Sequence, residues 1–251
     1  TRVDRIDFWF FIDTIKKESF QSSIVDCFRF ILSELKMEDH SETCDLLVVG
    51  GGATGLGVAL QAALEGRSVV LVEARDFASG TSSRSTKLLH GGVRYLAQGR
   101  LGLVREALRE RATVLGLAPH LAQPLSFVVP ASGWLNWAFT GVGLKLYQWL
   151  SGSLSLGRTV ALSRQALARA LPGMAGQVGR AVAGMRYWDG QFEDARLALA
   201  LAQTAQRAGA QVHNHTRVTA LSPTPNGWQV RLLDERLGTS RTVQARCVVN
   251  A

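Results

Sequence analysis

The chain has 251 residues, of which 47% are hydrophobic, and its formal net charge is +8, so it can form one large domain or two small ones around a core. No apolar run reaches the length of about 18 residues that a membrane-spanning helix needs, which excludes such a helix within this sequence. The three cysteines (Cys27, Cys44 and Cys247) are too far apart for a zinc site or a disulfide framework, so we expect a reducing compartment and no metal site.

Residues 1–36 differ in composition from the rest of the chain. They contain no Gly, Ala or Pro but six of the ten Phe, and their six basic and six acidic residues cancel. We therefore expect residues 1–41 to be an N-terminal extension outside the fold, with a natural start near Met37. The alternative is a genuine N-terminal helix, because apolar residues follow helical spacing at Ile24, Phe28, Ile31, Leu32 and Leu35. The whole +8 lies in residues 37–251, where it serves either solubility or attraction to an anionic substrate or membrane surface.

The first regular elements predict a βαβ unit. An apolar strand is expected over residues 45–49, a helix over 53–65 with Gly66 as its end, and a second strand over 68–73. Residues 76–100, rich in Gly, Ser and Thr, predict an extended functional loop.

The later elements are helices and strands without an internal repeat. Helices are expected over 103–117, 135–150 and 194–208, and strands over 127–130, 211–221, 228–233 and 242–250. The sequence stops at "RCVVNA", inside the last of these strands, and we therefore expect the chain to be truncated.

A glycine-rich turn follows the first strand. Gly50, Gly52 and Gly55 match the pattern G-x-G-x-x-G, and Glu73 closes the next strand 23 residues after Gly50. Gly50 permits the tight turn, Gly52 lets a pyrophosphate approach the backbone, and Gly55 lets helix and strand pack closely. The helix N-terminus attracts phosphate, and Glu73 can accept hydrogen bonds from ribose hydroxyls while repelling the 2′-phosphate of NADP. The pattern predicts dinucleotide binding; the alternative is a purely structural turn.

The segment after Glu73 distinguishes NAD from FAD. A simple NAD domain would continue with alternating strands and helices, whereas this chain continues with "ARDFASGTSSRSTKLLHGGVRYL". Such a polar, glycine-containing segment suits a long cofactor. The late strands also suit a flavin fold, in which a β-meander and a returning strand complete the nucleotide domain.

The segment from "DLLVVGGGATGLG" through "TSSRSTKLLHGGVRYL", continued by "YWDGQFEDARLALALAQTAQRAGAQV" and "CVVNA", resembles the FAD-dependent glycerol-3-phosphate dehydrogenases, the respiratory, quinone-linked type. The resemblance covers about residues 42–251. It implies an α/β fold: a discontinuous, partial FAD-binding Rossmann-like domain of the glutathione-reductase type with a β-meander. Residues 120–190 are expected to form a substrate- or membrane-facing insertion.

The resemblance implies a set of FAD-binding residues. The glycine turn would hold the pyrophosphate, the Ser/Thr run would lie along pyrophosphate and flavin, and the residues around "KLLHGG" would run beside the isoalloxazine. The implied residues are Gly50, Gly51, Gly52, Ala53, Thr54, Gly55, Glu73, Ala74, Thr81, Ser82, Ser83, Lys87, Leu88, His90, Gly91, Gly92 and Val218. For Gly91 and Gly92 a plain glycine turn is the alternative, and for Val218 a plain strand valine.

Three residues are candidates for catalysis. Arg94 can bind a phosphate through bidentate hydrogen bonds, the Tyr95 hydroxyl can hold a substrate oxygen, and His90 can accept a hydroxyl proton. The resemblance implies oxidation of sn-glycerol 3-phosphate to dihydroxyacetone phosphate, with quinone as the electron acceptor or, alternatively, oxygen. The structural alternatives are a surface Arg with a core Tyr and a histidine that orients its loop. For the truncated chain alone, we expect an inactive or weakly active flavin-binding module.

The stretch "GWLNWAFTGVGLKLYQWLSG" has many aromatic residues and a single charge, Lys145. Aromatic side chains suit the headgroup region of a membrane; the alternative is a helix buried against a domain outside this sequence. The resemblance implies a peripheral protein on the cytoplasmic face of a membrane, the bacterial inner membrane. It is compatible with a homodimer, and no nucleic-acid partner is expected.

Overall fold

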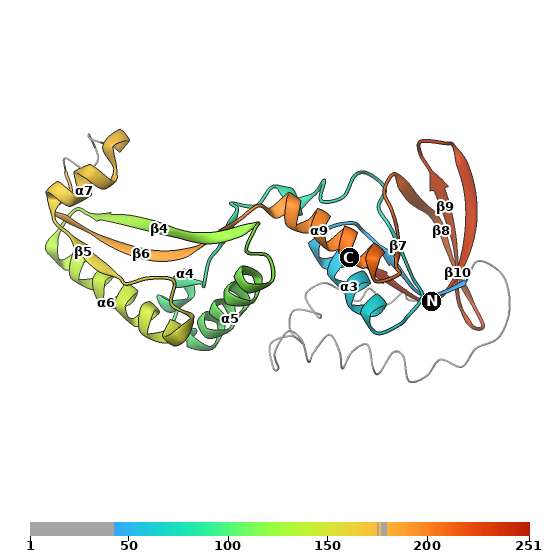
Figure 1. The fold of residues 1–251 in the computed structure, drawn as a ribbon, viewed down its shortest axis with the longest axis horizontal. Helices are drawn as coiled ribbons and strands as arrows, with labels where there is room; N and C mark the ends of the chain where they lie inside the picture. Colours follow the sequence, from blue (N-terminus) through green and yellow to red (C-terminus); the bar gives the residue numbers. More distant parts are fainter. Residues whose placement is uncertain (1–42, 175, 177–179) are drawn as a thin grey trace. The chain divides into compact units, whose positions relative to one another are not determined.

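The computed structural model describes residues 43–174, 176 and 180–251 and divides the chain into two compact units (Figure 1). The first unit contains residues 43–85 and 194–251, and the second unit, residues 86–193, is inserted between them in the sequence. The expected extension over residues 1–41 and its alternative helix lie outside the described residues.

A six-stranded sheet forms the centre of the first unit, in the order β7-β2-β1-β10-β9-β8. Its parallel part consists of β1 (Thr43–Val49), β2 (Val69–Val72), β7 (Gln211–His213) and the second half of β10 (Thr239–Asn250). The first half of β10 forms an antiparallel meander with β8 (Thr216–Thr224) and β9 (Gly227–Asp234). The predicted βαβ start, meander and returning strand are therefore confirmed.

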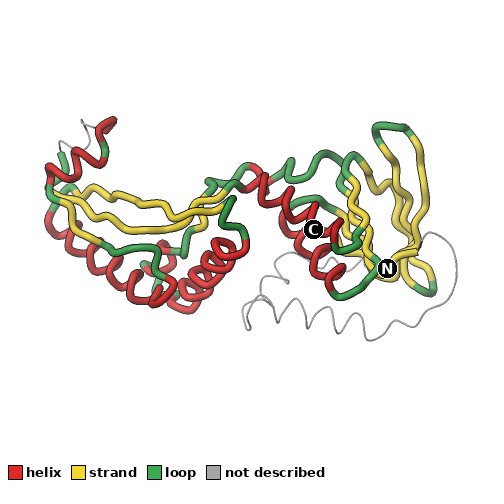
Figure 2. The backbone as a smooth tube through the Cα atoms, in the orientation of Figure 1, coloured by secondary structure: helices red, strands yellow, loops and turns green. Residues whose placement is uncertain are grey.

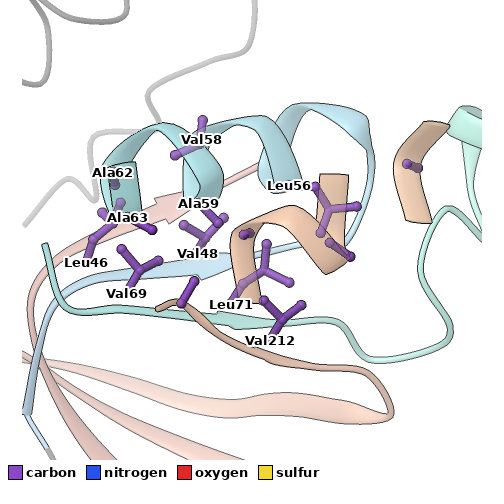
Figure 3. Close-up of a cluster of buried hydrophobic side chains, with 14 of the residues drawn as sticks. Leu46, Val48, Leu56, Val58, Ala59, Ala62, Ala63, Val69, Leu71 and Val212 are labelled. Atoms are coloured by element: carbon purple, nitrogen blue, oxygen red, sulfur yellow. The ribbon is translucent and has the colours of Figure 1, made fainter. Parts of the chain in front are cut away.

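Two helices cover one face of this sheet: α3 (Ala53–Leu64) and α9 (Asp194–Arg207). Both present alanines to each other and to the strands, and such small side chains allow the close packing seen in Figure 3. The cluster includes Leu46 and Val48 of β1, Val69 and Leu71 of β2, Leu56, Ala59 and Ala62 of α3, and Ala198, Ala202 and Ala205 of α9.

The alternate residues of the same strands form a second cluster on the other face. Leu47 of β1 and Val70 and Val72 of β2 pack there with Val230 of β9 and Val243 of β10. Because successive side chains of a strand point to opposite faces, the uninterrupted apolar run of β2 is explained by burial on both sides.

The second unit is built on an antiparallel sheet. Its long strands β4 (Ala122–Ala131) and β6 (Ala183–Phe192) pair without a break from Ala122↔Phe192 to Ala131↔Ala183, and β6 also pairs with β3 (Leu88–Leu89) and β5 (Val160–Leu162). The helices are α4 (Val93–Leu96), α5 (Leu101–Leu117), α6 (Trp134–Ser151) and α7 (Arg164–Ala170). Figure 2 shows α5 and α6 along one face of the long strands, where Val104, Leu108 and Tyr147 form a core.

Three single-turn 3₁₀ helices complete the described elements: η1 (Thr81–Ser83), η2 (Gly152–Leu154) and η3 (Pro172–Met174). The loop expected over residues 76–100 therefore contains η1, β3 and α4. The strand expected over 211–221 is divided into β7 and β8, because His215 has a positive φ of 49°. The strand expected over 127–130 is the end of the longer β4, and β6 is absent from the sequence-based elements.

Candidate functional site

The turn between β1 and α3 depends on two glycines. Gly50 has a φ of +116°, and its N–H donates to the carbonyl of Val72 at 2.8 Å. A Cβ on Gly55 would lie 2.1 Å from the carbonyl oxygen of Gly50. Both positions therefore require glycine: the first for its backbone conformation, the second because helix and turn are in direct contact.

The start of α3 is open to a ligand and is flanked by the Ser/Thr run. The first N–H groups of any helix lack acceptors within the helix, and its N-terminal end carries a partial positive charge. Here the N–H of Ala53 donates to Ser82 Oγ at 2.9 Å, and a Cβ on Gly52 would lie 3.1 Å from the same oxygen. The structure thus brings the predicted residues of η1 beside the predicted glycine turn.

The carboxylate of Glu73, directly after β2, faces the same turn. Its Oε2 accepts from the Gly51 N–H at 2.7 Å, and its Oε1 accepts from the Arg75 N–H at 2.8 Å. These two bonds fix the carboxylate beside the glycine turn. A carboxylate has about four acceptor positions, so capacity for ribose hydroxyls remains.

Val218 lies near the start of β8, which is bound to the segment after β2. The Thr216 N–H donates to the Glu73 carbonyl and the His215 N–H donates to the Arg75 carbonyl, both at 2.8 Å. Val218 is half-buried and pairs with Leu232. Val218, Glu73 and Ala74 are therefore on neighbouring segments.

The first unit passes a simple test of fit to a dinucleotide. It combines a side-chain-free turn, an exposed helix N-terminus at Ala53 and Thr54, hydroxyl groups beside it, and a fixed carboxylate at the end of the adjacent strand. These donors and acceptors match pyrophosphate and ribose.

Asp194, which the sequence indicated only as a helix start, supports this region. It is buried and begins α9, and its Oδ2 accepts from the hydroxyl of Ser85 at 2.7 Å and from the Ser85 N–H at 3.2 Å. This contact fixes the end of the Ser/Thr run that contains Thr81, Ser82 and Ser83.

The other predicted residues lie in the second unit, within one short segment. Lys87, with a positive φ of 57°, precedes β3, in which Leu88 pairs with Gln191. His90 is exposed and follows β3, while Arg94 and Tyr95 are exposed on α4. The segment therefore presents a histidine, an arginine and a tyrosine within six residues.

The packing of the second unit explains why positions 91 and 92 are occupied by glycine. A Cβ on Gly91 would lie 2.1 Å from Tyr147 Oη and 2.4 Å from Leu108 Cδ2. Gly92, the residue before α4, has a φ of +74°, and a Cβ on it would lie 2.8 Å from the Tyr95 ring. The segment thus packs tightly on α5 and α6.

Sequence reasoning missed a buried charge pair below Gly91. Arg111 of α5 and Asp189 of β6 are 2% and 1% exposed, and Arg111 Nη1 lies 3.0 Å from Asp189 Oδ1. Burial, together with the negative charge of Asp189, raises the pKa of the Tyr147 hydroxyl far above its usual range, so this hydroxyl remains a donor. One sequence signal was available: Asp189 is the first acidic residue after Glu110.

The described residues contain no group of three or more His, Cys, Asp or Glu side chains arranged to hold a metal ion. The described residues place donors and acceptors that fit a dinucleotide in the first unit, and the exposed side chains of His90, Arg94 and Tyr95 in the second.

The chain matches a known family and several known proteins. The profile of the family described as FAD dependent oxidoreductase matches residues 45–251. The chain is 43% identical over 231 residues to the mitochondrial glycerol-3-phosphate dehydrogenase of Macaca fascicularis, covering 86% of this chain and 31% of that protein. It is 44% identical over 214 residues to the glycerol-3-phosphate dehydrogenase of Mycobacterium leprae, covering 84% and 36%.

A solved structure agrees with these matches. The glycerol-3-phosphate dehydrogenase of Bacillus halodurans, complexed with FAD, superimposes with a TM-score of 0.62 at 32% identity, covering 84% of this chain and 34% of that one. The chain thus spans about a third of the length of the relatives that it matches.

Proposed function

The chain belongs to the family of FAD-dependent oxidoreductases, and on that premise we propose that its whole protein oxidises sn-glycerol 3-phosphate to dihydroxyacetone phosphate. The observation that carries the proposal is the identity of 43% and 44% to proteins named glycerol-3-phosphate dehydrogenase in an animal and a bacterium. The resemblance carried by the segment from Thr81 to Tyr95 is confirmed at the level of the family.

The first unit holds the cofactor in this proposal. The glycine turn and the N-terminus of α3 bind the pyrophosphate, Ser82 contributes a hydroxyl, and Glu73 accepts hydrogen bonds from a ribose. When bound, FAD supplies the acceptor for the hydride that leaves C2 of the substrate.

The second unit supplies the groups for the substrate. The Arg94 guanidinium binds the phosphate through charge-assisted hydrogen bonds, and Tyr95 holds a substrate oxygen. His90 accepts the proton of the C2 hydroxyl, so that loss of the hydride and of this proton leaves a carbonyl at C2. Support for these roles comes from the exposure of all three side chains within one short segment.

An anaerobic titration of the full-length protein with bound FAD tests the substrate. Glycerol 3-phosphate should bleach the flavin absorbance, whereas glycerol, which lacks the phosphate, should not. Arg94→Gln should raise KM for glycerol 3-phosphate by about 10- to 100-fold, the worth of a hydrogen bond to a charged group. Arg100→Gln, which changes an exposed arginine beyond α4, is the matched control. Bleaching by glycerol with equal efficiency would show that the phosphate is not needed for recognition of the substrate.

We further propose that the electrons pass to a membrane quinone; the rival acceptor is oxygen. Stopped-flow mixing of the substrate-reduced protein with a soluble quinone or with air-saturated buffer separates the two. Fast reoxidation by quinone and slow reoxidation by oxygen are expected, and the reverse order would make the protein an oxidase.

The helix α6 supports peripheral membrane binding. Six large apolar residues on it are more than a third exposed and fall within one sector of about 140° around the helix axis: Trp134, Leu135, Phe139, Val142, Leu146 and Trp149. Leu144 and Tyr147 are buried on the opposite side. No helix in the described part of the chain is both long and apolar enough to cross a bilayer.

The charges of the sequence that flanks α6 favour an anionic lipid surface. No acidic residue occurs between Glu110 and Asp189, while six basic residues other than Arg111 do: Lys145, Arg158, Arg164, Arg169, Arg180 and Arg186. An amphipathic helix with basic surroundings binds at the headgroup region through apolar burial and electrostatic attraction. We propose the cytoplasmic face of a bacterial inner membrane as the location, which fractionation of the source cells tests.

Vesicle sedimentation of the full-length protein tests this binding. Vesicles of phosphatidylglycerol should retain the protein more strongly than vesicles of phosphatidylcholine, and Leu135→Ser with Phe139→Ser should weaken retention at least about tenfold. Leu117→Ser with Leu237→Ser removes two leucines elsewhere that are also about three-quarters exposed or more, and it should have no effect. Equal retention of both double variants would indicate that α6 is covered by another part of the protein.

A further inference from the structure

We propose that Asp189 is a positioning residue that holds the segment from His90 to Tyr95 in its active geometry. The kinetic test of this inference uses glycerol 3-phosphate and therefore rests on the function proposed above. All the groups involved belong to the second unit.

The carboxylate of Asp189 binds donors from four different segments. Its Oδ1 accepts from the Gly91 N–H at 3.0 Å and from Arg111 Nη1 at 3.0 Å, and its Oδ2 accepts from the Tyr147 hydroxyl at 3.1 Å. The N–H of Gly190, the next residue of β6, lies 3.2 Å from Oδ1. The carboxylate therefore joins the segment at Gly91 to α5, α6 and β6.

The partners of Asp189 are themselves fixed. Arg111 Nη2 donates to the carbonyl of Leu154 at 2.8 Å, and Arg111 Nη1 lies 3.4 Å from Tyr147 Oη. A buried carboxylate is stable only when paired and hydrogen-bonded, and these contacts satisfy that condition. Such a network has one well-defined arrangement.

The arrangement reaches the proposed catalytic groups through the backbone. Gly91 is flanked by His90, and Gly92 begins α4, which carries Arg94 and Tyr95. On the other side, β3 pairs with β6 through Leu89↔Gly190, the residue after Asp189. Asp189 thus holds the middle of the segment by a charge-assisted hydrogen bond, while the strand pairing holds its start.

The missing Cβ of Gly91 makes this contact possible. Any side chain there would displace the segment from Tyr147 and Leu108 and lengthen the bond to Asp189. Gly91→Ala therefore moves the segment without removing any charge, whereas Asp189→Asn removes the charge and leaves the volume nearly unchanged. The two variants therefore disturb the same backbone segment in different ways, one by added volume and the other by lost charge.

The experiment uses the full-length protein with bound FAD and measures hydrogen exchange as well as kinetics. Asp189→Asn and Gly91→Ala should both increase amide exchange over residues 88–96 and lower kcat by about 100-fold, the effect of a displacement of about 1 Å in an active site. The fall in kcat should exceed the rise in KM, because proton acceptance by His90 depends on geometry more strongly than binding of a phosphate by Arg94. FAD content is measured for both variants and kcat is expressed per bound flavin, because the resemblance also places Gly91 beside the isoalloxazine.

The control is Leu167→Ala, which removes a fully buried side chain of α7 packed in another cluster of the same unit. It should lower the stability of the unit without altering exchange over 88–96 or the kcat of the folded protein. If Asp189→Asn matches this control, or keeps kcat within about twofold of the wild type, the inference is wrong.

A second pair of variants makes the test independent of folding defects. Tyr147→Phe removes the hydroxyl nearest to the added methyl group of Gly91→Ala, so the double variant should recover part of the kcat lost in Gly91→Ala. Recovery is measured relative to Tyr147→Phe alone, because that change also removes a donor to Asp189. Absence of recovery on this scale, with both proteins folded, would contradict the packing argument. Failure of the wild type to bleach with glycerol 3-phosphate would defeat the proposed function alone, because the exchange measurement does not depend on substrate.

Discussion

The two units fix their glycine-containing segments by different means. In the first unit, the turn from Gly50 to Gly55 is flanked by a strand that ends, a helix that begins and a glutamate at the end of the next strand, and Ala251 after β10 also packs against it. In the second unit, Gly91 is held by a carboxylate 98 residues away, which is in turn held by an arginine on α5.

This difference concerns charge as well as distance. The carboxylate of Glu73 is half-buried and accepts two backbone N–H groups, with capacity left for a ligand. The carboxylate of Asp189 is buried, and its described partners come from the fold itself. We infer that the first unit presents charge to its ligand, whereas the second uses charge to shape a backbone.

The largest effect is expected from breaking the buried pair. Arg111→Met should lower the free energy of unfolding of the second unit by about 3–5 kcal/mol, because it leaves Asp189 as an unpaired buried charge. Native-state hydrogen exchange of peptides from residues 101–117 and 183–192 measures this loss. Peptides of the first unit should keep their protection.

A double variant separates charge from packing. Arg111→Met with Asp189→Asn removes both charges, and part of the lost stability should return, because neither group is then an unpaired ion. If the double variant is less stable than Arg111→Met, the unpaired charge of Asp189 is not the cause of the lost stability.

A smaller but more local effect is expected in the glycine turn. Gly55→Ala places a methyl group against the Gly50 carbonyl and should destabilise the first unit by about 1–3 kcal/mol, with loss of bound FAD on gel filtration. Gly57→Ala, on the same helix, has no atom within 4 Å of the added methyl group. It should retain FAD and be more stable by about 0.5–1 kcal/mol. Equal FAD content in the two variants would contradict the assignment of the turn.

The carboxylate at the end of β2 should have a weaker effect. Glu73→Gln keeps the size and one acceptor oxygen but removes the charge, so affinity for FAD should fall by about tenfold, equivalent to about 1.4 kcal/mol. Fluorescence titration of the apoprotein with FAD measures the change. Glu65→Gln, which removes one negative charge from an exposed residue at the end of α3, serves as a control for net charge.

The same contrast explains what the sequence could predict. The glycine turn, Glu73, the βαβ order and the helices arise from local patterns: strand, turn residues and 3.6-residue periodicity. The FAD-binding positions were therefore accessible, and the structure brings Gly51, Ser82 and Glu73 together. The binding roles themselves stay predictions.

The second unit was less accessible for a physical reason. Strand β6 contains two glycines and a buried aspartate, and its burial does not alternate along the strand, so it lacks the strand pattern. The partners of Asp189 lie 42, 78 and 98 residues away, and no local rule connects them. Likewise, the aromatic content of α6 was evident from the sequence, but which residues are exposed required its packing on β6.

The smallest effect concerns a partly buried ion pair of the first unit, between Asp45 and Arg246, which is the counterpart of the fully buried pair in the second. Burial alone would raise the pKa of Asp45, but hydrogen bonds from Ser68 and Arg246, with the charge of Arg246, outweigh it and lower the pKa below 3.8. Because the folded-state pKa is depressed, the stabilisation is fully present above the unfolded-state pKa and is lost as the pH falls through the folded-state value. Asp45→Asn should therefore have a lower thermal midpoint than the wild type at pH 7, and this difference should shrink below about pH 4. A difference that persists at pH 2 would show that Asp45 acts through packing and not through its charge. The whole effect should be small, because the pair with Arg246 is partly open to solvent and is screened.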